Sequence, residues 1–96
     1  MTGMLTHVVS FTFTDPEDRH EAQARLEALP PYIEAIGSLT TGLDTVGDPG
    51  ASHLVLITTH DDLAGLRAYQ EHPVHQEFAA WVVPRLSAKT VVDFES

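Results

Sequence analysis

Two histidines and a tyrosine surround one proline in the stretch 69–78, and these residue types are suited to acid–base chemistry. A neutral imidazole accepts a proton near pH 7, and a tyrosine hydroxyl can donate a hydrogen bond to a developing oxyanion. The residue before a proline is disfavoured in a helix, whereas proline itself fits the first helical position. One helix is therefore predicted to end near His72, which would cap a second helix that begins at Pro73.

His75 falls in the first turn of that second helix, where the positive end of the dipole disfavours an imidazolium. It opens a stripe with helical spacing that is otherwise apolar and continues through Phe78, Ala79 and Val82. This pattern makes His75 the candidate general base for removing a proton next to a carbonyl. Tyr69 is the candidate hydrogen-bond donor to the carbonyl oxygen.

Hydrophobic periodicity predicts the elements that must hold this pair in place, in the order β-α-β-β-α-α-β. The expected strands span about 5–13, 38–46, 53–59 and 89–95, and the expected helices about 15–29, 61–69 and 73–83. This order is typical of an α+β, ferredoxin-like split βαβ fold, in which helices cover one face of a four-stranded antiparallel sheet. Residues 1–96 are predicted to form a single domain.

The other face of that sheet is expected to be open. The prediction places Val8, Ser10 and Thr12 of the first strand on it, with Leu54 and Leu56 of the third. An exposed apolar patch on a small domain indicates a partner, so a homodimer that closes two sheets together is predicted.

The first and third strands carry similar segments, Thr6-His7-Val8-Val9 and Ser52-His53-Leu54-Val55. We expect these strands to be adjacent, parallel and central, which would bring His7 and His53 together on the helix-facing side, beneath His75. Three of the six histidines would then converge on one site. A strand histidine on an apolar face is also typical of a hydrogen-bonded core residue, and that interpretation stays open. His20 and His60 are expected to be exposed.

Composition excludes several classes of function. Five Lys and Arg against 14 Asp and Glu give a net charge of −9, which argues against nucleic acid and anionic membranes as partners. The chain has no cysteine, serine elbow or glycine-rich phosphate loop. No signal-peptide pattern or membrane-spanning apolar run is present in the sequence, so a cytoplasmic location is expected. His72 and His75 could ligate zinc or iron, but no carboxylate is fixed beside them, and no metal site is predicted.

Several of these motifs together resemble the stress-responsive A/B barrel (Dabb) family of the dimeric α/β barrel superfamily. The matching segments extend over almost the whole chain: His7-Val8-Val9 with Phe11 and Phe13, Leu29-Pro30, Gly42, the His53 strand, Tyr69-x-x-His72-Pro73-x-His75 and Val91-Val92-Asp93-Phe94. The resemblance implies a ferredoxin-like protomer and a homodimer whose sheets form a barrel.

One branch of this family is similar to plant olivetolic acid cyclase, a polyketide cyclase that closes a ring by aldol chemistry without a cofactor. The resemblance implies catalytic roles for His75 and Tyr69, no cofactor, and a small hydrophobic carbonyl or phenolic ligand. The expected ligand contacts are His7, His53, Val9, Val55, Leu26, Phe78 and Trp81. Leu26 is aliphatic and Trp81 is expected to project into the same region, so the pocket could be narrower than in that branch. Two alternatives stay open: a non-catalytic stress-response or ligand-binding dimer, and a cofactor-free monooxygenase of the same superfamily.

Overall fold

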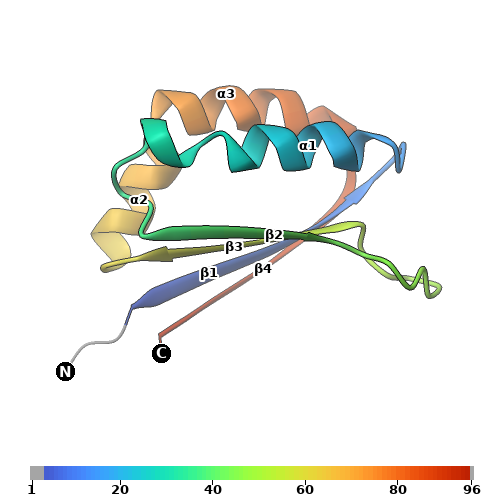
Figure 1. Cartoon of the computed structure of the whole chain (residues 1–96), viewed down its shortest axis with the longest axis horizontal. Coiled ribbons are helices and arrows are strands. Elements are labelled where there is room, and N and C mark those ends of the chain that lie inside the picture. The colour runs from blue at the N-terminus through green and yellow to red at the C-terminus, as the bar shows by residue number, and fades with distance from the viewer. Residues whose placement is uncertain (1–3, 96) are drawn as a thin grey trace.

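The computed structural model describes residues 4–95, in which three helices lie on one face of a four-stranded sheet (Figure 1). The elements are β1 (Leu5–Phe13), α1 (Asp18–Glu27), β2 (Ser38–Leu43), β3 (Leu54–His60), α2 (Leu63–Glu71), α3 (Pro73–Val82) and β4 (Leu86–Glu95). Their order and the ferredoxin-like α+β class agree with the prediction. No helix in this described range is long and apolar enough to cross a membrane.

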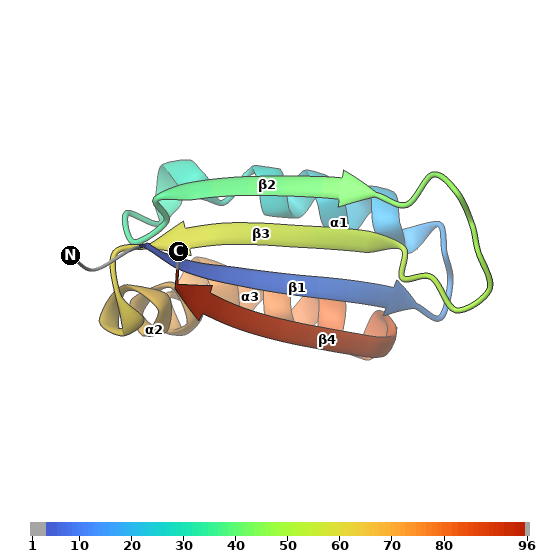
Figure 2. The ribbon, with the colours of Figure 1, turned by 90° about the horizontal axis from the view of Figure 1, so that it is seen from below.

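The strands are ordered β2-β3-β1-β4, and every neighbouring pair is antiparallel (Figure 2). The glycine-containing β2 lies at one edge, and β1 and β3 are adjacent and central, as predicted. The expectation that β1 and β3 run parallel is wrong. The crossover through α1 leaves β1 and β2 pointing the same way, and the connection from β2 reverses the chain before β3 is inserted between them.

Antiparallel pairing decides which side chains share a face. Phe11 lies opposite Leu54, and Val9 lies opposite Leu56. Both leucines are therefore buried beneath the helices, each only 2% exposed, and the prediction that they lie on the open face is wrong. Alternation along the strand places their neighbours Val55 and Ile57 on the open face instead.

The open face is apolar along its centre. Val8 of β1 is paired with Ile57 on one side and with Val92 of β4 on the other, so the three side chains form a row across three strands. Val92 is 60% exposed and Phe94 is 46% exposed. Within the part of the chain that the structure describes, no helix covers this face (Figure 2), so it remains available for another surface.

Polar side chains form hydrogen bonds at the starts of two helices. The Asp62 carboxylate accepts a hydrogen bond of 2.8 Å from the Gly65 N–H and fixes the start of α2. α1 begins at Asp18, three residues later than predicted, because the Asp15 carboxylate accepts from the Glu17 N–H and holds the preceding residues in a turn. Leu26 of α1 is fully buried and helps to anchor this helix on the sheet.

Candidate active site

The site is organised by the junction of α2 and α3. His72 has extended backbone angles, φ −63° and ψ 136°, and ends one helix while it caps the next. Its Nδ1 accepts a hydrogen bond of 3.1 Å from the Val74 N–H. This geometry confirms the predicted boundary at Pro73, and it directs His72 to the backbone rather than to a ligand.

Tyr69 and His75 meet across this junction. Their rings make an edge-to-face contact with centroids 4.6 Å apart. The Tyr69 hydroxyl and the His75 Nδ1 are both buried, and neither has a hydrogen-bond partner. Buried polar atoms in folded proteins are almost always satisfied, so two unsatisfied atoms on touching residues require an explanation.

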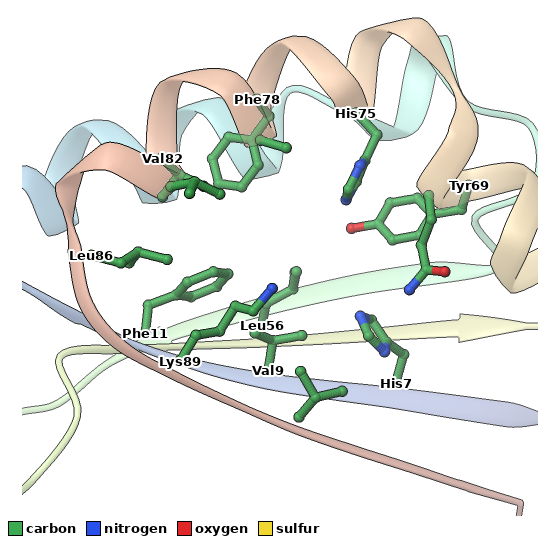
Figure 3. A pocket seen from close by; sticks show the side chains of 14 residues that line it. His7, Val9, Phe11, Leu56, Tyr69, His75, Phe78, Val82, Leu86 and Lys89 are labelled. Carbon is green, nitrogen blue, oxygen red and sulfur yellow. The ribbon is translucent and has the colours of Figure 1, made fainter.

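Both rings border a cavity of about 130 Å³ between α3 and the sheet (Figure 3). Its walls come mainly from β1, α3 and β4, and are mostly apolar. The lining residues are His7, Val9, Phe11, Leu56, Tyr69, Gln70, His75, Phe78, Ala79, Val82, Val83, Leu86, Lys89 and Val91. Five of the nine predicted site residues are among them, and the predicted His75–Tyr69 pair shares one space.

Burial sets the protonation of this pair. It lowers the pKa of His75; a hydrogen bond with the Gln70 backbone opposes the shift, and the electrostatic influence of His7 and Lys89 adds to it. The direction agrees with the prediction, but loss of solvent, rather than the helix dipole, is the main cause. Burial also raises the pKa of the Tyr69 hydroxyl. At neutral pH the site therefore offers a neutral imidazole and a protonated phenol.

His7 enters the cavity from β1 and is held by Asp93 of β4, which faces it in the sheet register. A carboxylate can only accept, so the His7 Nδ1–H donates to Asp93 and the Nε2 stays available on the other side of the ring. The His7 ring lies 6.3 Å from the Tyr69 ring, measured between centroids. Asp93 thus orients a second imidazole in the site, a contact that the sequence had not indicated.

His53 does not join this cluster, and its predicted convergence with His7 is wrong. Because β1 and β3 are antiparallel, His53 lies near Phe13, at the opposite end of β1 from His7. Its Nδ1 accepts a hydrogen bond of 3.0 Å from the Phe13 N–H, and its ring stacks on the Phe13 ring. These contacts give it a structural role.

His60 occupies the place expected for His53. It was expected to be exposed, but it is fully buried, with its ring centroid 5.0 Å from that of Tyr69. The His60 Nδ1–H donates to the Ala35 carbonyl at 2.8 Å, which leaves Nε2 to accept from the Thr58 hydroxyl at 2.9 Å. Burial lowers the pKa of His60. Because both ring nitrogens are occupied, His60 supports the site without taking part in proton transfer.

Three other predicted contacts also lie outside the cavity. Val55 is on the open face of the sheet, and Leu26 is packed in the core beneath α1. Trp81 does not project into the cavity. Two guanidinium groups lie over its ring instead, with the Cζ of Arg25 4.4 Å and that of Arg85 4.5 Å from the ring centroid.

The last strand supplies residues that sequence reasoning missed. Lys89, Val91 and Asp93 alternate on the helix-facing side of β4, and the first two line the cavity. The available signal was the pair of charged residues at alternate positions of a strand whose inward positions should be apolar. Within residues 4–95, no group of three or more His, Cys, Asp or Glu side chains is arranged to hold a metal ion.

The fold and this site agree with the family comparison. The profile of the stress-responsive A/B barrel domain (Dabb) matches residues 5–96. The chain therefore belongs to the stress-responsive A/B barrel family. A search of the curated proteins found no match.

Solved structures extend the comparison. A dimeric ferredoxin-like protein of unknown function from Thermobifida fusca is 28% identical, with a TM-score of 0.85 over 98% of this chain and 92% of its own. Hydroxynitrile lyase from Passiflora edulis is 14% identical, with a TM-score of 0.84 over 98% and 94%. SnoaB, a cofactor-independent oxygenase from Streptomyces nogalater, is 19% identical, with a TM-score of 0.76 over 98% and 93%. At these low identities the two enzymes share only the fold with this chain.

Proposed function

We propose that this protein is a cofactor-independent acid–base enzyme that transfers a proton at the carbon next to the carbonyl of a small hydrophobic compound. The reaction class includes isomerisation, aldol-type cyclisation and the reverse cleavage. The observation that carries the proposal is that Tyr69 and His75 touch and line one cavity, and that each has a buried polar atom without a hydrogen-bond partner.

In this proposal the His75 imidazole takes the proton from the carbon next to the carbonyl. The electron pair of the broken C–H bond moves into the carbonyl and forms an enolate. The Tyr69 hydroxyl donates a hydrogen bond to the enolate oxygen, and its raised pKa keeps it protonated for this task. The protonated His75 then returns the proton to the product, so the enzyme ends each cycle unchanged.

His7 is assigned a supporting role in the same cavity. Asp93 fixes the orientation of its ring, and the free Nε2 can contact a second polar group of the substrate. The apolar side chains of Val9 and Phe78 exclude water from the reacting carbon, which strengthens the electrostatic contribution of Tyr69.

The cavity volume favours a compact substrate. An engineered protein cavity of about 150 Å³ holds benzene, so a space of about 130 Å³ corresponds to one small ring or a short chain. This supports a monocyclic or short-chain carbonyl compound over an extended polyketide. Cyclisation of a polyketide, as in the plant cyclase branch, is therefore the less favoured form of the proposal.

Hydrogen–deuterium exchange tests the proposal without knowledge of the natural substrate. Acetylacetone and cyclohexanone in D₂O would be followed by proton NMR with the wild type and two variants. We expect exchange above the buffer rate, a loss of about a hundredfold or more in His75→Gln, and a similar loss in Tyr69→Phe. His20→Gln, on the exposed surface of α1, is the matched control. Exchange at the buffer rate with the wild type would contradict the proposal.

A non-catalytic ligand-binding protein is the alternative, since the same cavity could hold a small molecule without converting it. Binding of the two ketones with no exchange would favour this alternative.

In either case we infer a homodimer that forms through the open face of the sheet. The exposed Val92 and Phe94 support this inference, as does the dimeric state of the Thermobifida fusca relative.

A further inference from the structure

Lys89 is the only lysine in the chain, and it lines the cavity. It is exposed on the helix-facing side of β4, where it is paired with Phe11 of β1. Its side chain extends into the cavity that His75, Tyr69 and His7 also face (Figure 3). A cation is thus directed at the candidate reaction site.

The ammonium group of Lys89 has no anionic partner among residues 4–95. The ion pairs in this range join His7 to Asp93, His20 to Glu17 and Arg25 to Glu21. Asp93 is the nearest acid on the same face of β4, but four residues of extended chain separate the two backbones by about 13 Å. In a protein with a net charge of −9, the absence of a partner at this position is not explained by a shortage of acids.

The arginines differ from Lys89 in this respect, since each is engaged with the protein. Arg19 donates to the Pro16 carbonyl, Arg67 to the Gln70 side chain, and Arg85 to the Trp81 carbonyl. Arg25 donates to Glu21. Lys89 is therefore the cationic side chain whose hydrogen-bond donors remain available to a ligand in the described structure.

We infer that Lys89 binds an anionic group of the substrate, and that the preferred ligands are single-ring or short-chain carbonyl compounds bearing a carboxylate. This inference rests on the proposed function, because it concerns the same cavity. The anion would lie beside Lys89, and the reacting carbon would lie between His75 and Tyr69. The apolar walls in between would hold the ring or chain.

An imine-forming role fits Lys89 less well than a charge-recognition role. A lysine that attacks carbonyls must be neutral, which requires burial or a neighbouring cation to disfavour the ammonium form. Lys89 is instead on the exposed edge strand β4, and among the described residues no arginine or second lysine lines the cavity beside it. An exposed ammonium can still select anions, because the apolar cavity floor weakens the competition from water.

Two ligands of matched shape test the inference. 4-Hydroxybenzoate carries a carboxylate, and 4-hydroxybenzamide replaces it with a neutral amide of similar size. Their dissociation constants for the wild type, Lys89→Met and Lys89→Arg would be measured by NMR titration at pH 7. We expect the wild type to bind the carboxylate about tenfold more tightly than the amide, Lys89→Met to lose this preference, and Lys89→Arg to retain most of it.

Equal affinity of the wild type for the two ligands, or a preference that survives in Lys89→Met, would overturn the inference. Failure of the wild type to bind either ligand at millimolar concentration would also overturn it. Unchanged amide binding in Lys89→Met shows that the variant is folded. Because the readout is binding, a Lys89-dependent preference without deuterium exchange would contradict the proposed function alone. Exchange that requires His75, with no such preference, would contradict only the anion site.

Discussion

The Tyr69 and His75 rings touch edge to face at a centroid distance of 4.6 Å, and the Tyr69 hydroxyl and the His75 Nδ1 are both buried without a hydrogen-bond partner. Leaving a buried donor or acceptor unpaired costs about 1–3 kcal/mol, so this arrangement lowers the stability of the fold. We attribute this cost to a role of the two residues in binding a ligand, because both line the same cavity.

Replacing Tyr69 with phenylalanine should raise the stability of the protein and lower its activity. The ring would keep its contacts with His75 and His60, while the unsatisfied hydroxyl would be removed. We expect the free energy of unfolding to rise by about 1 kcal/mol in urea denaturation, while deuterium exchange falls. A clear loss of stability in Tyr69→Phe would show that the hydroxyl has a partner in the folded protein.

His60 should behave in the opposite way. His60→Leu removes a ring whose two nitrogens satisfy the Ala35 carbonyl and the Thr58 hydroxyl. Leaving these buried groups unpaired should lower the free energy of unfolding by about 2–3 kcal/mol, as measured in urea. The exposed His20→Gln is the control and should change it by less than about 0.5 kcal/mol. A His60→Leu variant as stable as the wild type would contradict the structural role.

Stability should also fall in mild acid. Burial lowers the pKa of both His60 and His75 in the folded state, so below about pH 6.5 the unfolded chain binds more protons than the folded one. The stability that their neutral forms contribute is complete above that pH and is lost as the pH falls through the folded-state values. Urea midpoints from pH 7.5 to 5 would show this decline, and it should be shallower in His75→Gln. An equal slope in both proteins would argue against a buried neutral His75.

The helix boundary at the site was predictable from the sequence, but the set of residues that form the site was only partly predictable. Proline chemistry is local, so the His72–Pro73 boundary and the position of His75 followed from a few neighbouring residues. The local pattern could not show that His60, rather than His53, lies beside Tyr69, because this depends on the direction of β3 relative to β1. That direction is set by the path of the chain through α1 and β2, and not by the pattern within either strand.

Residues of β4 illustrate a second limit. Asp93 and Lys89 occupy inward positions of an edge strand, and alternation alone would have marked them as unusual. Their roles depend on what lies across the sheet and beneath α3, which only the assembled structure provides. Trp81 was misplaced for a related reason, since its contact with Arg25 joins residues far apart in the sequence.

The open face of the sheet should control self-association. Val8→Glu places a charge in the middle of the apolar row formed with Ile57 and Val92, where burial against a second sheet would be costly. We expect the wild type to sediment as a dimer and Val8→Glu as a monomer. Ala24→Glu, on the exposed side of α1, should leave the dimer intact. A dimeric Val8→Glu variant would show that the interface lies elsewhere.

The pH dependence of deuterium exchange into a small ketone tests the central claim most directly. If His75 is the base, kcat/KM should rise with pH through its lowered pKa and reach a plateau before neutral pH, because the neutral imidazole is the active form. The His75→Gln variant should lose both the rate and this profile. A wild-type rate that falls as the pH rises from 5 to 7, or an unchanged profile in His75→Gln, would contradict the account.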